Sequence, residues 1–383
     1  MANKDSFKYL GMVFTKTHNM AAAAEHMLAP FMAGCQRIRQ FAAEHHLTDR
    51  PHALLWLAKT YAVPASMYAC QIWGTKFMRQ GAEMDCPLQT VHLCLLKGFL
   101  GVKRATPNWS VLRECGQEPL QFYWFRAAAR FYNALLGSNS TVLSKVLKAD
   151  VTLSASNRQC WTAEFLEACN GLNRRDVFAQ CLLNRRPVPL GDFVVDLRKR
   201  LREVWRQANV QSDGEQLSKL AKYHNWVALP LRQVTAVGLP FSLPRYLHLD
   251  LGKQTLRNVS RFRLHAHTLR VETASWQQHN ACCEKCDMQA VQDEKHAIFH
   301  CSCIQMCTLR MRYADLFHDF PLTDKIFVNQ TGAFYFAQIR TEDVFTFFQK
   351  QTNDTYCFIS DAMDFFCMAE QSNHLAEGTH CLS

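Results

Sequence analysis

The sequence lacks the short motifs by which many enzymes are recognised. It contains no G-x-G-x-x-G, no phosphate-binding G-x-x-x-x-G-K-[ST], no H-E-x-x-H and no G-x-S-x-G. The H-x-E…P-C-x-x-C signature of zinc deaminases is also missing. These absences argue against a dinucleotide- or nucleotide-binding enzyme, a zinc protease, an α/β-hydrolase and a deaminase. We therefore expect no small-molecule substrate and no catalytic residue in this chain.

Long apolar runs are also missing. The best membrane candidate, Ala53–Trp73, is interrupted by Lys59 and Pro64, so a buried helix is the better interpretation and no membrane partner is expected. Met1–Ser6 shows no leader pattern. The 17 cysteines are an odd number without a disulfide framework, and they predict buried thiols and a metal site in an intracellular protein, nuclear or cytoplasmic.

Acidic residues are scarce except near the C-terminal end. The chain has a formal net charge of +10, yet Thr341–Ser383 contains one basic residue and seven acidic ones. The segment Arg174–Arg206 has nine basic and four acidic residues. A basic body with an acidic end suits a polyanionic partner such as RNA or DNA. A set of solvated helix faces is the alternative.

One cysteine-histidine pattern has the spacing of a metal site. Cys283, Cys286, His296 and Cys301 form C-x₂-C-x₉-H-x₄-C, which predicts a four-coordinate Zn²⁺ site. Four protein ligands leave no position for a reactive water, so the predicted ion is structural. The first ligand could be Cys282 or Cys283. Further rival ligands lie nearby: His300, Cys303 and Cys307.

Apolar residues recur at helical spacing along most of the chain, which predicts a mainly α fold. Phe7–Phe14 predicts one short N-terminal strand, and the polar segment Ser138–Ser156 predicts a loosely ordered connection. Pro230, Pro240 and Pro244 mark a second joint. The predicted helices are Ala21–His46, Ala53–Trp73, Ala82–Phe99, Leu120–Leu136, Phe193–Gln207 and Leu256–Trp276.

The helix predicted over Leu256–Trp276 is basic and precedes the cysteine cluster. Its arginines are candidates for phosphate contacts, although a solvated face would have the same composition. An aromatic ring at its end could stack on a base or pack in the core. The candidate nucleic-acid-binding residues are Arg257, Arg261, Arg263, Arg270 and Trp276.

Several sequence blocks occur in a fixed order. Phe7–Gly11 reads F-K-Y-L-G, Pro64-x₃-Tyr68 is followed by Ile72-Trp73-Gly74, and Phe99–Val102 reads F-L-G-V. Arg261–Trp276 contains R-F-R-L-x₂-H-x-L-x-V-E-T, and the cysteine cluster ends in D-E-x-H-x₄-C. Together these blocks resemble the C-terminal region of a non-LTR (LINE-type) retrotransposon reverse transcriptase, over about residues 7–320.

The resemblance implies a thumb- and connector-like helical bundle with a CCHC zinc knuckle. It suggests five segments: a remnant of the polymerase palm edge at 1–15, a thumb-like domain at 16–150, and a helical connector at 151–252. The basic helix and knuckle follow at 253–320, and an acidic helical tail at 321–383. Two departures are His265, where the family commonly has Gly, and Ala274-Ser275, where it has Gly-Arg.

The resemblance also implies that the polymerase catalyst is absent from this chain. The family's Y/F-A-D-D carboxylate pair would lie before Phe7, and Tyr313–Leu316 mimics only its beginning. The acidic stretch from His318 to Lys325 loosely evokes an endonuclease centre but lacks its Pro-Asp pair. We therefore expect a nucleic-acid-binding fragment that is not an enzyme by itself. The alternatives are a residual enzyme completed by upstream sequence and a helical protein-interaction scaffold.

Overall fold

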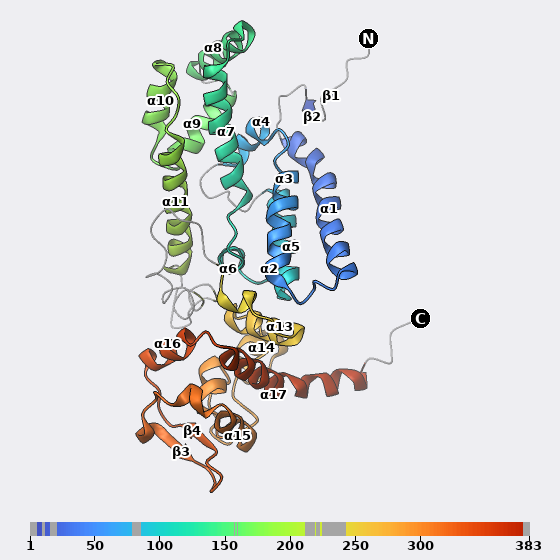
Figure 1. Cartoon of the computed structure of the whole chain (residues 1–383), viewed down its shortest axis with the longest axis vertical. Helices are drawn as coiled ribbons and strands as arrows, with labels where there is room; N and C mark the ends of the chain where they lie inside the picture. Colours follow the sequence, from blue (N-terminus) through green and yellow to red (C-terminus); the bar gives the residue numbers. More distant parts are fainter. Residues whose placement is uncertain are drawn as a thin grey trace.

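The computed structural model describes residues 6–9, 12–15, 21–78, 86–156, 158, 160–210, 219, 223 and 243–377. The described part is mainly helical with two small sheets, as the sequence predicts. Its longer helices are α1 (Ala21–Glu44), α5 (Pro87–Leu100), α7 (Leu120–Gly137), α8 (Thr141–Ala155), α9 (Trp161–Asn170), α10 (Arg175–Leu183), α11 (Leu190–Val210), α13 (Lys253–Arg263), α15 (Ile304–Arg312), α16 (Thr341–Gln349) and α17 (Asn353–Glu377). Figure 1 shows α1 to α11 above and α13 to α17 below.

The N-terminal strand prediction is corrected in detail. Strands β1 (Ser6–Tyr9) and β2 (Met12–Thr15) form an antiparallel hairpin in which Ser6 pairs with Thr15. A run of eight residues with alternating aromatic character looks like one strand unless the turn at its centre is recognised. Leu10 and Gly11, where the chain reverses, lie outside the described residues.

The helix predicted over Ala53–Trp73 is divided. It comprises α2 (Pro51–Leu57), a π-helical turn (Ala58–Ala62), α3 (Val63–Ala65) and α4 (Cys70–Trp73). Pro64 has no N–H to donate to the preceding turn, which favours the altered hydrogen-bond register. Ala69 then adopts a φ of 52°, and this left-handed residue separates α3 from α4.

The prediction of a loose connection at Ser138–Ser156 is wrong. The segment forms α8, and the Ser140 hydroxyl accepts a hydrogen bond from the Leu143 N–H at 3.4 Å. Such a cap satisfies one of the N–H groups that have no partner within the helix. Leu147 is buried against the neighbouring helices, and this contact stabilises α8 although the segment is largely polar in composition.

Two apolar cores hold the described chain together. The larger contains residues from Met12 to Phe366, and the edge-on pair Trp73 and Trp124 lies within it with ring centroids 4.9 Å apart. The smaller is formed by helices α7 to α11, where Phe165 contacts several aromatic rings. The larger core crosses the predicted segment boundaries at 15, 252 and 320.

The helix predicted over Leu256–Trp276 is two helices, α13 and α14 (Arg270–Gln277). Between them His265 has a φ of 49°, in the left-handed region that favours glycine. The chain turns at His265 and directs α14 toward the cysteine cluster.

The C-terminal part packs on the same core. Strands β3 (Lys325–Phe327) and β4 (Phe334–Phe336) form a second antiparallel hairpin. Helix α17 lies along α13 and also contacts α15 (Figure 1). Acidic residues on α17 participate in this packing: Asp364 accepts a hydrogen bond from Asn258 at 2.8 Å. None of the helices that the structure describes combines the length and apolarity needed to cross a bilayer.

Candidate metal centre and the basic residues around it

Two short antiparallel segments build the first half of the cysteine cluster. The Cys283 N–H donates to the Ala290 carbonyl, and the Gln292 N–H donates to the Ala281 carbonyl, each at 2.8 Å. Cys282 pairs with Val291 as an isolated bridge. Because successive side chains of an extended segment point to opposite sides, only one of the two adjacent cysteines can face the centre. That residue is Cys283, which is 5% exposed.

A capped turn builds the second half. Asp293 Oδ1 accepts the His296 N–H at 2.7 Å, in the manner of a helix N-cap. A π-helical turn follows at His296–His300, and the Cys301 N–H closes it by donating to the His296 carbonyl at 2.9 Å. This wide turn brings His296 and Cys301 to the same side.

The structure places the predicted ligand residues together. One ligand atom from each of Cys283, Cys286, His296 and Cys301 lies within 4.8 Å of all the others. Cys286 Sγ and His296 Nε2 are 3.5 Å apart, and Gln292 Nε2 donates to Cys283 Sγ at 3.6 Å. A hydrogen bond from the Cys301 thiol lowers the pKa of Cys283, against the opposing effect of burial. The cluster could hold one metal ion.

The rival ligands have other contacts. His300 Nδ1 lies 2.7 Å from the Phe336 carbonyl, the Cys303 thiol donates to Gln305 at 2.6 Å, and the Cys307 thiol donates to the Cys301 carbonyl at 3.7 Å. Each therefore supports the chain around the cluster. None of them belongs to the set of converging ligand atoms found in the described residues.

A buried arginine, which the sequence analysis missed, lies behind Cys301. Arg310 is 0% exposed and donates to the Ile298 carbonyl at 2.7 Å and the Cys301 carbonyl at 2.8 Å. It also reaches the carbonyls of Ala297 and Phe334, both at 3.3 Å. Burial lowers the pKa of Arg310 to about 10, which the nearby cysteines oppose. Its side chain ties the π-helical turn to β4.

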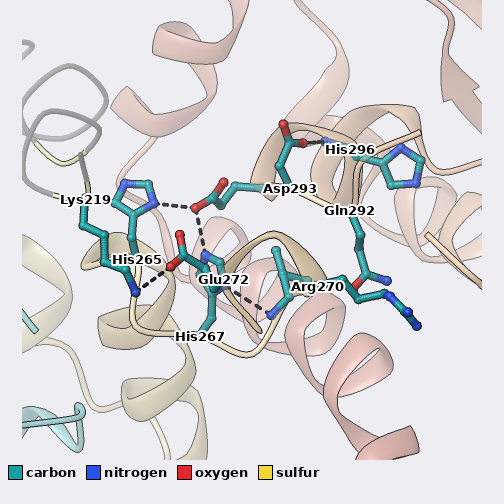
Figure 2. Close-up of polar contacts among 10 residues, drawn as sticks. Lys219, His265, His267, Arg270, Glu272, Gln292, Asp293 and His296 are labelled. Atoms are coloured by element: carbon teal, nitrogen blue, oxygen red, sulfur yellow. Dashed lines mark hydrogen bonds and ion pairs between the residues drawn. The ribbon is translucent and has the colours of Figure 1, made fainter. Parts of the chain in front are cut away.

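A second polar cluster joins the turn at His265 to the metal-site turn. His267 Nε2 lies 2.8 Å from Glu294 Oε1, and His265 Nδ1 contacts the same oxygen. Figure 2 labels the two histidines. The Leu269 N–H donates to His267 Nδ1 at 3.3 Å, so His267 carries its proton on Nε2 and donates it to Glu294. Burial opposes ionisation of Glu294, but the two imidazoles hold its pKa well below the usual range.

This second cluster is held by hydrogen bonds. Two ligands of one zinc ion, each about 2.0 Å from it, would lie roughly 3.3 Å apart in a tetrahedron. The His267–Glu294 distance of 2.8 Å is shorter and typical of a hydrogen bond. Glu272, the fourth acidic or histidine residue nearby, pairs with Lys219 at 2.5 Å (Figure 2). The sequence motif D-E-x-H contains three of the residues that build this region: Asp293 caps the turn, Glu294 contacts His265 and His267, and His296 faces the metal centre.

Arg263 is the clearest correction among the predicted nucleic-acid contacts. It is 6% exposed, and its guanidinium makes two contacts with the Glu114 carboxylate, at 2.5 and 3.2 Å. Tyr223 donates to the same carboxylate at 2.7 Å, and the Arg263 guanidinium lies over the Tyr246 ring. A basic side chain on an amphipathic helix looks solvated in sequence, but here its carboxylate partner is 149 positions away.

The other predicted contacts are spread out. Arg257 is exposed and lies beside Gly101, whose carbonyl accepts a hydrogen bond from Arg261 at 2.9 Å. Arg270 donates to the Asn280 carbonyl at 2.8 Å and pairs with Glu284. Trp276 belongs to α14, but its side chain lies outside the described residues. The four arginines therefore do not form one cationic surface.

The acidic residues considered for catalysis do not converge. Asp315 is exposed on a short 3₁₀ turn, Ala314–Phe317, and Tyr313 donates to Asp361 at 2.9 Å. Asp319 is exposed and pairs with Lys350 at 2.7 Å. These placements agree with surface and packing roles.

No known family model, curated protein or solved structure matches this chain.

Proposed function

We propose that this chain is a zinc-stabilised nucleic-acid-binding protein, resembling the region that follows the polymerase core in LINE-type reverse transcriptases. The observation that carries the proposal is the convergence of three cysteine sulfurs and one imidazole on a single point. The donor set is soft, closed and placed between an extended turn and a capped helical turn. A structural ion would fix both elements.

Zinc suits these distances. With Zn–S near 2.3 Å and Zn–N near 2.0 Å, a tetrahedral site places sulfur and nitrogen about 3.5 Å apart. The Cys286 Sγ–His296 Nε2 distance is 3.5 Å. Three thiolates and one neutral imidazole around Zn²⁺ have a net charge of −1, and the buried Arg310 would compensate it. When bound, the ion would supply folding free energy, and no open position would remain for a reacting water.

Nucleic acid is the proposed partner because of the charge. The net charge of +10 is carried by arginine and lysine side chains and favours a polyanion. Phosphate contacts by such side chains are independent of sequence and weaken as salt rises. We propose that the chain alone does not catalyse nucleotide addition, since its acidic residues offer no carboxylate pair at the described sites.

Three measurements on the purified 383-residue chain test this function. Metal analysis should give one zinc per chain, and fluorescence anisotropy should show binding to labelled RNA or DNA that weakens with salt. Primer extension on an RNA template with Mg²⁺ should give no product. Zinc-free folded protein would contradict the metal proposal, and absence of binding at 50 mM salt would contradict the nucleic-acid proposal.

A helical scaffold for another protein is a second candidate. A groove of about 590 Å³ between α1 and the π-helical turn is lined mainly by apolar atoms, and Tyr61 at its edge is 63% exposed. Exposed aromatic residues of this kind are common at protein interfaces. The nucleic-acid proposal is preferred because of the charge of the chain as a whole.

A further inference from the structure

A second groove lies on the outer side of α7, far in sequence from the metal centre. Its volume is about 510 Å³, and α7 forms one wall while the α3–α4 turn forms the other. The α7 wall carries Arg126 and Arg130 together with aromatic side chains. The polar, charged and aromatic residues of its lining are Gln71, Tyr123, Arg126, Arg130 and Phe131.

The positions of the two arginines are electrostatically unfavourable in the unbound protein. They are four positions apart on one helix, so their charges lie on the same face and repel each other. In the described part of the chain neither forms an ion pair with a carboxylate, since the nearby Glu118 pairs with Arg198 at 2.8 Å. Arg126 Nε is buried and has no hydrogen-bond partner among the described residues.

We propose that this groove binds a single strand of nucleic acid, with phosphates at Arg126 and Arg130. This inference rests on the proposed function and locates its binding surface away from the basic helix α13. A guanidinium offers paired N–H donors that match phosphate oxygens, and both arginines line the groove. A bound phosphate would also relieve the repulsion between the two cations.

The size and lining of the groove favour a single strand over a duplex. A volume of about 510 Å³ is that of a site for a small ligand, which suits a nucleotide unit with a splayed base and not a duplex. Tyr123 and Phe131 are half-buried and present aromatic surface beside the cations. Alternating cationic and aromatic side chains are typical of single-strand binding, where stacking is tolerant of sequence.

The test compares matched charge removals in the full chain. Binding of a fluorescein-labelled 20-nucleotide RNA, the same sequence as DNA, and a duplex would be measured between 50 and 300 mM salt. The variants are Arg126→Gln with Arg130→Gln in the groove, Arg257→Gln with Arg261→Gln on α13, and Arg175→Gln with Arg186→Gln on the exposed surface of α10 and the turn after it (the α10 pair). Each pair removes the same charge.

The groove pair should weaken single-strand binding at least tenfold and flatten the slope of log affinity against log salt by about 1.4, at roughly 0.7 per phosphate contact. The other pairs should change the slope by less than half as much. If the groove variant loses the same affinity for RNA as for DNA, the groove recognises phosphate and stacked bases. If it loses more affinity for RNA, the groove also contacts the ribose hydroxyl. Both outcomes support the groove.

Three results would overturn the inference. If the groove pair loses no more than the α10 pair, the groove is a solvated surface and only this inference fails. Stronger binding of the duplex than of either single strand would contradict the proposed occupant. If the unsubstituted chain binds none of the probes, the proposed function fails as well. Circular dichroism and zinc content of each variant would show that the fold is retained.

Discussion

Replacing Arg263 with methionine separates a structural role from a binding role. The substitution keeps the length of the side chain but removes the charge that lies against Glu114, which is 0% exposed. At a charge separation near 4 Å and an effective dielectric constant of 20, the lost attraction is about 4 kcal/mol. Removal of one partner of a buried pair typically destabilises a protein by about 3–5 kcal/mol, which fits this value. The remaining Tyr223 hydrogen bond cannot neutralise the carboxylate.

Thermal unfolding followed by fluorescence would check this magnitude. A loss of 3–5 kcal/mol should lower the midpoint by at least roughly 5 °C, since each kcal/mol shifts chains of 150–250 residues by about 2–4 °C. Arg263→Met combined with Glu114→Gln should recover part of the loss, because no buried charge remains uncompensated. If Arg263→Met left the midpoint unchanged but caused a large loss of RNA affinity, the structural role of Arg263 would be refuted and a phosphate contact would be supported instead.

The same pair predicts a dependence of stability on pH. Although burial opposes its ionisation, Arg263 and the tyrosine hydrogen bonds hold the pKa of Glu114 below its ordinary value. A lowered folded pKa means that the stabilisation is complete above the unfolded value, near 4.3, and is lost as pH falls through the folded pKa. Unfolding midpoints between pH 7 and pH 3 should therefore fall less steeply in the Arg263→Met, Glu114→Gln variant. If the unfolding midpoints of the unsubstituted and doubly substituted chains fell equally with pH, this linkage would be contradicted.

Three further predictions concern the metal centre. Cys301→Ser should lose zinc, measured by metal analysis, and should unfold at a lower temperature; full zinc retention would contradict the ligand set. Arg310→Met should weaken zinc about 10–100-fold in a chelator competition, because support of metal ligands commonly has effects of this size; an unchanged affinity would leave Arg310 as a packing residue. Glu294→Leu should reduce hydrogen-exchange protection at His265–Leu269, and retained protection would contradict the bridge.

The sequence predicts the helical class well because apolar spacing records which face of a segment is buried. The four candidate ligands are also readable, since C-x₂-C and H-x₄-C are local patterns whose turns are set by few residues. Even the choice between Cys282 and Cys283 depends only on alternation in an extended segment. Local rules were sufficient at each of these positions.

Other features depend on partners that are distant in the chain. Arg263 cannot be distinguished from a solvated arginine until Glu114 is placed beside it, and Arg310 is ordinary in sequence although it is fully buried. The break in the basic helix depends on the left-handed backbone of His265, a residue type that gives little warning of it. The sequence analysis did not single out Arg126 and Arg130, because the groove they line is completed by the α3–α4 turn, whose position depends on the fold.

The larger core has a consequence for how this chain can be divided in the laboratory. Cys283, Cys301, Phe31 and Phe366 belong to one continuous cluster of buried side chains. An expression fragment that begins at residue 253 would retain the cysteines but expose the surface of α13 that packs on α5 and on Glu114. Such a fragment should aggregate or bind zinc without a unique fold. Chelation of the intact chain, conversely, should be sensed at Trp73 and Trp124, so their fluorescence would report metal loss from a site built by a different part of the sequence.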